Sequence, residues 1–227
     1  RRAIRGFGFS MHASKPGSGL PRPRKKPTQP RAVFTVQAIY DGFVRIWRRD
    51  GPAAATTRAI AAETGYSVGT IYDYFPNRTA LLAGYYEHCI DRLCEQLVAA
   101  DTDSADRPWP ARLRLLVQRL YGQSSDSPYF DREMLTRESL VANPGRQQHA
   151  FEKCSACVYE LIQGWPDRPG AVSRRHVDTL VQTVWGSMRY AHILGRDTLA
   201  ADAHVEDLTL MARALLLSAA DDTPDMG

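Results

Sequence analysis

A serine between two glycines is one group whose type and spacing could do chemistry. The run Gly65-Tyr66-Ser67-Val68-Gly69 matches the G-x-S-x-G motif, in which a strained turn exposes a serine as the nucleophile of a hydrolase. That motif needs a strand before the serine and a helix after it. The residues before Ser67 have a helical pattern instead. We therefore expect no enzyme, and a serine hydrolase that uses Ser67 stays as an alternative function.

Two cysteines three positions apart, Cys154 and Cys157, could bind zinc or carry out thiol chemistry. A structural zinc site needs four ligands, and no second pair lies at a fitting spacing. Residues three apart on a helix are neighbours, so we expect reduced thiols packed in a core or groove, with a redox role left open. Histidine is also a common metal ligand, and the candidates in the chain are His88, His176, His192 and His204. Their spacing fits no metal site, and we predict neither metal nor cofactor.

Residues 56–75 have the features of two short helices joined by a tight turn. Thr56 or Thr57 can cap the first helix by accepting a backbone N–H. Gly65 suits the left-handed residue that ends this helix, and Ser67 can cap the next one. The apolar residues expected to face inward are Ile60, Ala61, Ile71 and Phe75. The pattern predicts a helix-turn-helix.

The second of these helices would begin with the small residues Val68, Gly69 and Thr70. Small side chains let a helix enter the major groove of DNA, which is about 12 Å wide. The N-terminus of a helix also directs free N–H groups and a positive dipole at phosphates. This geometry predicts DNA binding.

The two short helices need a helical framework to position them. An apolar stripe from Val36 to Trp47 predicts a preceding helix, which Gly51 and Pro52 should end. Further helical patterns cover residues 77–99, 111–122, 128–140, 145–164, 173–194 and 203–219. No alternating pattern indicates a strand, so we predict an all-α fold of about nine helices.

Charge divides the chain into unequal parts. Residues 1–30 carry eight Lys or Arg and no acid, whereas residues 79–227 carry fifteen Lys or Arg against 21 acids. A basic N-terminal third suits contact with a polyanion. We predict a disordered basic tail over residues 1–30, because Pro and Gly are frequent there and no core can form. No apolar run is long enough for a membrane span or a secretory signal, so we expect a cytoplasmic protein.

The helix-turn-helix segment resembles a known family in detail. The run Thr-Thr-Arg-x-Ile-Ala…Gly-x-Ser-x-Gly-Thr-Ile-Tyr-x-Tyr-Phe-x-Asn-Arg-x-x-Leu is similar to the DNA-binding domain of the tetracycline-repressor (TetR) family of bacterial regulators, over about residues 33–84. Two residues depart from the family pattern. Tyr66 stands where Val or Ile is usual, and Arg78 stands where Lys is usual.

The resemblance implies roles for the matching residues. Thr57 and Tyr72 would hydrogen-bond phosphates, and Arg78 would hold a phosphate at the start of the following helix. The residues expected near base edges are Arg58, Val68, Gly69, Thr70 and Tyr74, behind the cap Ser67. Arg58 is the strongest candidate to recognise guanine, since Arg is the commonest specific reader of that base. For Tyr74, packing in the core is an equally good interpretation.

The resemblance also implies a domain organisation, with a three-helix DNA-binding domain at 31–78 and a helical ligand-binding and dimerisation domain at 79–227. Helices 173–194 and 203–219 would form the homodimer interface. Aromatic, Met and polar residues of the middle helices are candidates to bind a small-molecule effector. They are Tyr86, Tyr121, Met134, Phe151, Trp185, Met188, Arg189 and His192.

The function expected from these features is a ligand-responsive transcriptional repressor. It would bind palindromic operator DNA as a homodimer, because two recognition helices read more bases than one. A small-molecule effector would release it from DNA. A DNA-binding protein without an effector stays as a second alternative, and activation in place of repression stays open.

Overall fold

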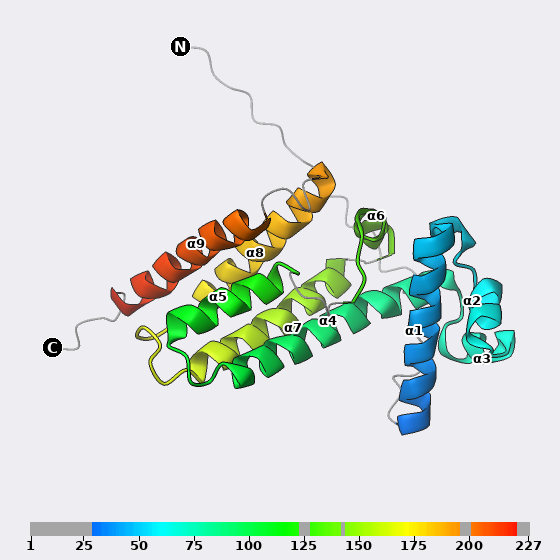
Figure 1. The fold of residues 1–227 in the computed structure, drawn as a ribbon, viewed down its shortest axis with the longest axis horizontal. Coiled ribbons are helices and arrows are strands. Elements are labelled where there is room, and N and C mark those ends of the chain that lie inside the picture. Colours follow the sequence, from blue (N-terminus) through cyan, green and yellow to red (C-terminus); the bar gives the residue numbers. More distant parts are fainter. Residues whose placement is uncertain (1–28, 123–127, 142–143, 196–200, 222–227) are drawn as a thin grey trace, which may run out of the picture.

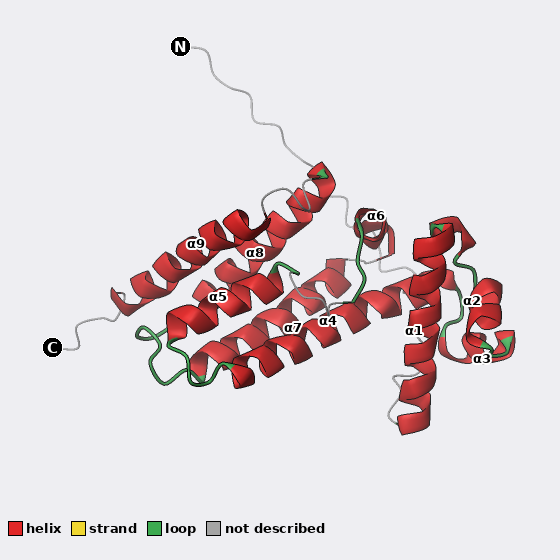
Figure 2. Ribbon diagram, viewed as in Figure 1, coloured by secondary structure: helices red, strands yellow, loops and turns green. Residues whose placement is uncertain are grey.

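The computed structural model describes residues 29–122, 128–141, 144–195 and 201–221, and the regular elements in these ranges are all helical (Figures 1 and 2). In chain order they are α1 (Pro30–Asp50), the 3-10 helix η1 (Pro52–Ala54), α2 (Thr57–Thr64), α3 (Val68–Tyr74), α4 (Arg78–Asp103), α5 (Trp109–Leu120), α6 (Arg132–Val141), α7 (Pro144–Gln163), α8 (Arg174–Leu194) and α9 (Ala201–Asp221). The predicted all-α fold is confirmed. The predicted basic tail lies outside the described residues, apart from its last two.

The ends of α2 and α3 have the local chemistry expected from the sequence. The Thr56 hydroxyl accepts the N–H of Ala59 at 3.1 Å, and the Ser67 hydroxyl accepts the N–H of Thr70 at 3.0 Å. Between the two helices, Gly65 has a φ of 74°, in the left-handed region that favours glycine. A side-chain cap stabilises a helix by about 1 kcal/mol, which matters for helices as short as these.

The N-terminal core lies between α1, α2, α3 and the first turns of α4. Its fully buried side chains include Ile39, Phe43, Ile60, Ile71, Phe75 and Leu81. On α4, Leu82, Tyr85 and Tyr86 also belong to this core, although the predicted domain boundary falls at residue 78. Full burial of such a side chain stabilises the fold by roughly 1.5–3 kcal/mol, so the start of α4 is an integral part of the N-terminal domain.

A second core fills the space between α4, α5, α7, α8 and α9. Leu113, Val158, Trp165 and Val181 are completely or almost completely buried there, together with Leu97 from the far half of α4. The single helix α4 thus contributes to both cores, as its diagonal course in Figure 1 indicates. Within the described part of the chain, no helix is sufficiently long and apolar to cross a membrane.

The helices expected from the sequence all occur, with shifted ends. The largest shift at a start is in α6, expected from residue 128 but beginning at Arg132. The cause is Asp131, whose carboxylate accepts the N–H of Met134 at 2.7 Å and so caps the helix. The residues from Pro128 to Asp131 are irregular.

Candidate nucleic-acid interface and ligand pocket

The start of α3 is open to solvent. Val68 is 37% exposed and Gly69 is also exposed, whereas Ile71, one turn later, is completely buried. Figure 1 shows α2 and α3 at one end of the molecule, away from α5 and α7–α9. The helix therefore presents its small N-terminal residues outward while Ile71 and Phe75 fix it to the core.

Hydroxyl groups surround this exposed helix start. The Thr57 hydroxyl donates to the Tyr72 hydroxyl at 3.3 Å, and both side chains reach the surface. The hydroxyl oxygens of Ser67 and Thr70 lie 2.9 Å apart. Hydroxyls and free helix N–H groups of this kind are suitable phosphate ligands.

Arg58 projects from α2 into solvent. Tyr74 is half-buried and packs against the N-terminal core, so its ring has a structural role whatever else it contacts. Arg78 donates a hydrogen bond to the carbonyl of Pro52, which ties the start of α4 to η1. Burial, with a smaller effect from the charge of Arg137, lowers the pKa of Arg78 from its usual value.

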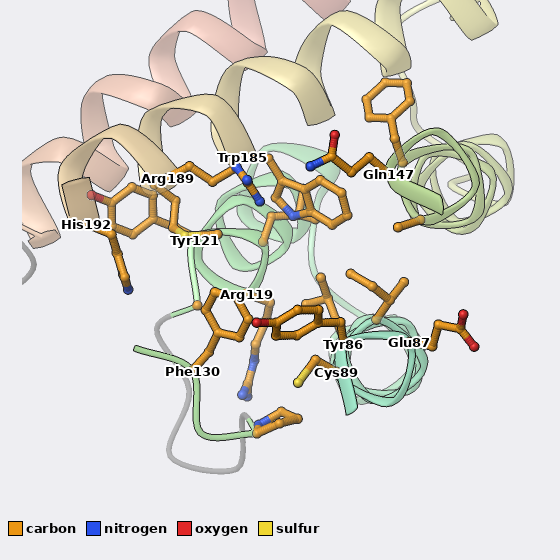
Figure 3. A pocket seen from close by; sticks show the side chains of 18 of the residues that line it. Tyr86, Glu87, Cys89, Arg119, Tyr121, Phe130, Gln147, Trp185, Arg189 and His192 are labelled. Carbon is orange, nitrogen blue, oxygen red and sulfur yellow. The ribbon is translucent and has the colours of Figure 1, made fainter. Parts of the chain in front are cut away.

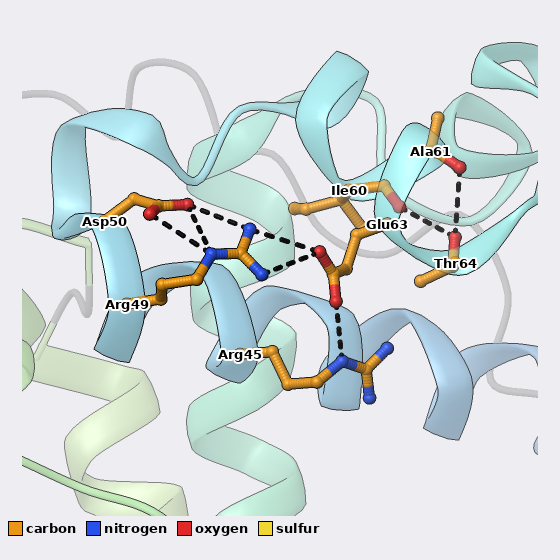
Figure 4. A network of polar contacts seen from close by, with 7 residues as sticks. All are labelled: Arg45, Arg49, Asp50, Ile60, Ala61, Glu63 and Thr64. Carbon is orange, nitrogen blue, oxygen red and sulfur yellow. Dashed lines mark hydrogen bonds and ion pairs between the residues drawn. The ribbon is translucent and has the colours of Figure 1, made fainter.

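Ion pairs fix α2 against α1, a contact that the sequence analysis did not find (Figure 4). Glu63 on α2 accepts from Arg45 Nε at 2.8 Å and from Arg49 at 3.2 Å, and Arg49 also pairs with Asp50. These hydrogen bonds, that of Arg45 first, lower the pKa of Glu63. The spacing of Arg45 and Arg49, one helical turn apart, is the only signal that the sequence offered.

A cavity of about 440 Å³ lies between α4, α5, α7 and α8 (Figure 3). Seven of the eight predicted ligand-binding residues line it, namely Tyr86, Tyr121, Phe151, Trp185, Met188, Arg189 and His192. Met134 does not line it and is completely buried in the N-terminal core. The tertiary fold therefore brings together residues that are as much as 106 positions apart in the chain.

Several polar lining residues were missed from the sequence. They are Glu87, Arg119, Arg146 and Gln147, and the apolar Phe130 was missed with them. Arg119 had a detectable signal, because it interrupts a helix whose Leu116, Val117 and Leu120 are buried. For Arg146 and Gln147 there was none, because they lie only two and three residues after the first residue of α7.

A short segment joins the cavity wall to the helix-turn-helix end of the molecule. Phe130 lines the cavity, and the next residue, Asp131, accepts the indole N–H of Trp47 on α1 at 2.8 Å. The hydroxyls of Tyr85 and Tyr86 on α4 donate to the carbonyls of Tyr129 and Met134, each at 2.6 Å. The start of α6 is therefore bonded to both α1 and α4.

The cysteines are free thiols. Cys154 is completely buried and the half-buried Cys157 places its Sγ 3.8 Å from the carbonyl of Cys94. Hydrogen bonds from Cys154 and Cys157, assisted by the charge of Lys153, lower the pKa of Cys94 to about 4. The described residues contain no group of His, Cys, Asp or Glu arranged to hold a metal ion.

Ser67 lacks the surroundings of a nucleophile elbow. The residues before it form α2 rather than a strand, and its hydroxyl accepts the N–H of Thr70 as a helix cap. The residues that match G-x-S-x-G therefore form the turn, and the start of the second helix, of the helix-turn-helix.

In the described residues, an exposed and capped helix-turn-helix stands at one end of a helical fold, which is the arrangement of helix-turn-helix proteins. Residues 39–85 match a family model described as bacterial regulatory proteins, tetR family. The segment that contains α2 and α3 therefore matches the tetR family of bacterial regulatory proteins.

Solved structures share the fold over most of the chain. A TetR-family regulator from Mesorhizobium loti is 14% identical, with 84% of this chain and 98% of that one covered at a TM-score of 0.60. Thermus thermophilus FadR, a TetR-family repressor in complex with lauroyl-CoA, is 21% identical. The match covers 81% of this chain and 94% of that one at a TM-score of 0.54. A TetR regulator from Haloarcula marismortui is 16% identical, with 82% of this chain and 98% of that one covered, and its TM-score is also 0.54. No curated protein sequence matches the chain.

Proposed function

We propose that this protein is a transcriptional regulator of the TetR type, a ligand-responsive repressor that binds palindromic operator DNA as a homodimer. The observation that carries the proposal is the solvent-exposed start of α3, where Val68 and Gly69 project from the family-matched segment. Small residues at an exposed helix N-terminus are suited to the major groove.

In the proposed complex, Thr57 and Tyr72 bind a phosphate through their adjacent hydroxyls. Arg58 reads a base edge beside the start of α3, with Val68, Gly69, Thr70 and Tyr74 nearby. Arg78 contacts a second phosphate. A guanidinium has five N–H donors, so its bond to Pro52 leaves others for this contact.

Dimerisation through α8 and α9 supplies the second recognition helix. Large apolar side chains on these two helices are exposed in the single chain, among them Tyr190, Ile193, Leu194, Leu210 and Met211. A shallow apolar groove also runs between the two helices, lined by residues such as Leu180 and Met211. Exposed apolar surface of this kind favours a partner, and a two-fold axis would place two α3 helices about 34–36 Å apart for neighbouring half-sites.

Effector control follows from the position of the cavity. Tyr86 and Phe130 line it and also belong to the contacts that join α6 to α1 and α4. A ligand that fits the cavity in only one arrangement of these contacts shifts the population of DNA-binding orientations. The FadR structure contains lauroyl-CoA, which supports ligand control in this fold. The cavity argues against the alternative of a DNA-binding protein without an effector.

Selection of bound sequences from a random DNA pool tests the proposal. We expect a palindrome, and Arg58→Ala should relax the preference at one base position per half-site, at a cost of about 1–3 kcal/mol. Arg114→Ala is a control, because Arg114 lies on α5 and pairs with Glu206. Recovery of no palindrome by the wild-type chain would refute operator recognition, and an unchanged preference in Arg58→Ala would refute its role.

A further inference from the structure

Three of the four cysteines meet where α4 packs against α7. Cys94 lies on α4, and Cys154 and Cys157 lie about one helical turn apart on α7. The two helices lie side by side in Figure 1. The thiols of Cys154 and Cys157 are both in hydrogen-bonding range of the Cys94 sulfur, and the Sγ of Cys157 lies 3.8 Å from the Cys94 carbonyl oxygen. Spacing in the sequence gave no sign of this third thiol, because Cys94 and Cys157 are 63 positions apart.

The surroundings of Cys94 favour its thiolate form. Hydrogen bonds from Cys154 and then from Cys157 lower its pKa to about 4, and the positive charge of Lys153 acts in the same direction. Burial and the negative charge of Asp91 oppose this shift without reversing it. Lys153 is held beside the thiols by its ion pair with Asp91. Because the thiolate is the nucleophilic form of cysteine, Cys94 is the group of this cluster that reacts first.

Burial divides the other two thiols between a structural and a reactive role. Cys154 is completely buried in the second core, whereas Cys94 and Cys157 are partly exposed and open to small solutes. Donation to Cys94, followed by burial, raises the pKa of Cys157 and keeps it protonated beside the thiolate. Oxidation of Cys94 to a neutral group removes the main cause of this shift. Cys157 then becomes available as a second nucleophile, while Cys154 stays in the core.

We propose that Cys94 is an oxidation site for small hydroperoxides, and that Cys157 completes the reaction by forming a disulfide between α4 and α7. The reaction involves neither DNA nor the cavity, so it goes beyond the proposed function.

The proposed reaction has two steps. The Cys94 thiolate attacks the outer oxygen of the peroxide, an S–O bond forms, the O–O bond breaks, and the departing oxyanion takes a proton from solvent. Cys157, as its thiolate, then attacks the Cys94 sulfur, the S–S bond forms, the S–O bond breaks, and hydroxide leaves with the proton that Cys157 gave up. Two thiols lose two electrons in total. The peroxide is reduced to an alcohol, or to water in the case of hydrogen peroxide.

Hydrogen peroxide is the probe for the full, reduced chain. After treatment, the remaining thiols are alkylated and the intact mass and the peptide map are measured by mass spectrometry. We expect a loss of two hydrogen atoms per chain, a bond between the Cys94 and Cys157 peptides of one chain, and recovery of both thiols with a reducing agent. Absence of this bond would overturn the proposal, and a bond from Cys94 to Cys154 would overturn the roles of the two α7 thiols.

Variants separate the two steps. Cys157→Ser should form no disulfide and should accumulate a sulfenic acid at Cys94, which dimedone labels. Cys94→Ser should show neither product. Cys89→Ser is the matched control, since Cys89 is also partly exposed on α4 but lies outside the cluster, and it should oxidise as the wild type does. A disulfide in Cys94→Ser would contradict the assignment. Circular dichroism checks that the variants fold, and the wild-type peptide map needs no variant.

The pH profile of alkylation tests the thiolate directly. Iodoacetamide modification of Cys94 in the wild-type chain should proceed at a nearly constant rate between about pH 5.5 and 8, because the thiolate is already formed at the lower value. N-acetylcysteine, an ordinary thiol, should react roughly 200-fold faster at the upper pH, as expected from a pKa of about 8.5. An increase of similar size at Cys94 would show that its surroundings do not stabilise the thiolate, and the proposal would fail.

Discussion

Single residues decide how closely α1 and α2 approach. Gly42 on α1 faces Thr64 on α2, and a Cβ at position 42 would overlap the Thr64 Cγ2 atom. Thr64 cannot rotate freely, because its hydroxyl donates to the carbonyl of Ile60 at 2.7 Å. The position of α2, and with it Arg58, therefore depends on the missing side chain of one glycine.

Gly42→Ala should lower the free energy of unfolding by about 1–2 kcal/mol, because the steric overlap outweighs the better helix propensity of alanine. Denaturant unfolding measures this. Thr64→Ser is the matched background, since it removes the overlapping methyl group and keeps the hydroxyl. In that background Gly42→Ala should be neutral or stabilising by up to about 1 kcal/mol. The same loss in both backgrounds would disprove the steric explanation.

His88 makes the contact between α1 and α4 sensitive to pH. Its ring stacks on Tyr40 at 4.9 Å, and burial, followed by the charge of Arg92, lowers its pKa below the usual value. The unfolded chain therefore takes up a proton before the folded chain does. Stability from this residue is complete above about pH 6.5 and is lost as the pH falls toward the folded pKa.

We expect thermal melting to fall less steeply between about pH 7 and 5 in His88→Gln than in the wild type. Differential scanning calorimetry at several pH values measures the difference. His149→Gln provides a control, because His149 is exposed on α7. Identical pH profiles for His88→Gln and the wild type would contradict the assignment.

At the scale of residues, the sequence predicted those features that are set by residues close together in the chain. The caps Thr56 and Ser67 and the turn at Gly65 need only their local residues, so they were predictable. The bond from Arg78 to Pro52 crosses 26 positions, and the pocket residues Arg119 and Arg146 meet only after α5 and α7 have packed. Nothing local encodes such contacts.

At the scale of elements, a buried polar cluster joins α4, α5 and the end of α7. The Arg112 side chain is 7% exposed and donates to Asp101 at 2.7 and 3.1 Å. The indole N–H of Trp165 donates to the same carboxylate at 2.8 Å, and the Arg112 guanidinium lies 5.3 Å from the ring centroid of Trp165. One carboxylate therefore satisfies donors from α5 and from Trp165, which follows the end of α7.

Asp101→Ala should destabilise the chain by about 3 kcal/mol, because it leaves a buried guanidinium and a buried indole N–H without their acceptor. Addition of Arg112→Met should recover part of the loss, since it removes the uncompensated charge. Chemical unfolding of the two variants measures both effects. A double variant less stable than Asp101→Ala would show that the arginine contributes mainly through packing.

Helix number and order were predictable because amphipathic spacing and the Gly and Pro breaks are strong signals. The start of α6 was placed too early, because Tyr129 and Phe130 extend the apolar pattern. They serve contacts with Asp131, Tyr85 and Tyr86 instead of a helical face. Tertiary contacts outweighed the helical pattern there.

At the scale of the whole molecule, the proposed function needs two copies of the chain. Met211 is 58% exposed on α9 and lines the groove between α8 and α9. Met211→Glu should convert the proposed dimer to a monomer, because it places a charge in an apolar interface. Analytical ultracentrifugation measures the mass, and affinity for the selected palindrome should fall with it. Val98→Glu, 48% exposed on α4, is the control, and a Met211→Glu chain that stays dimeric would exclude this interface.

Because α4 contributes side chains to both cores, no position within this helix separates the two domains cleanly. A fragment cut after residue 78 would lose Leu81, Leu82 and Tyr85, which form one wall of the N-terminal core. The N-terminal domain that we propose to bind DNA therefore cannot be transferred by itself to another protein, and a stable transfer has to include the first turns of α4. The same restriction applies to recombination during evolution, because a crossover inside α4 would disrupt both hydrophobic cores.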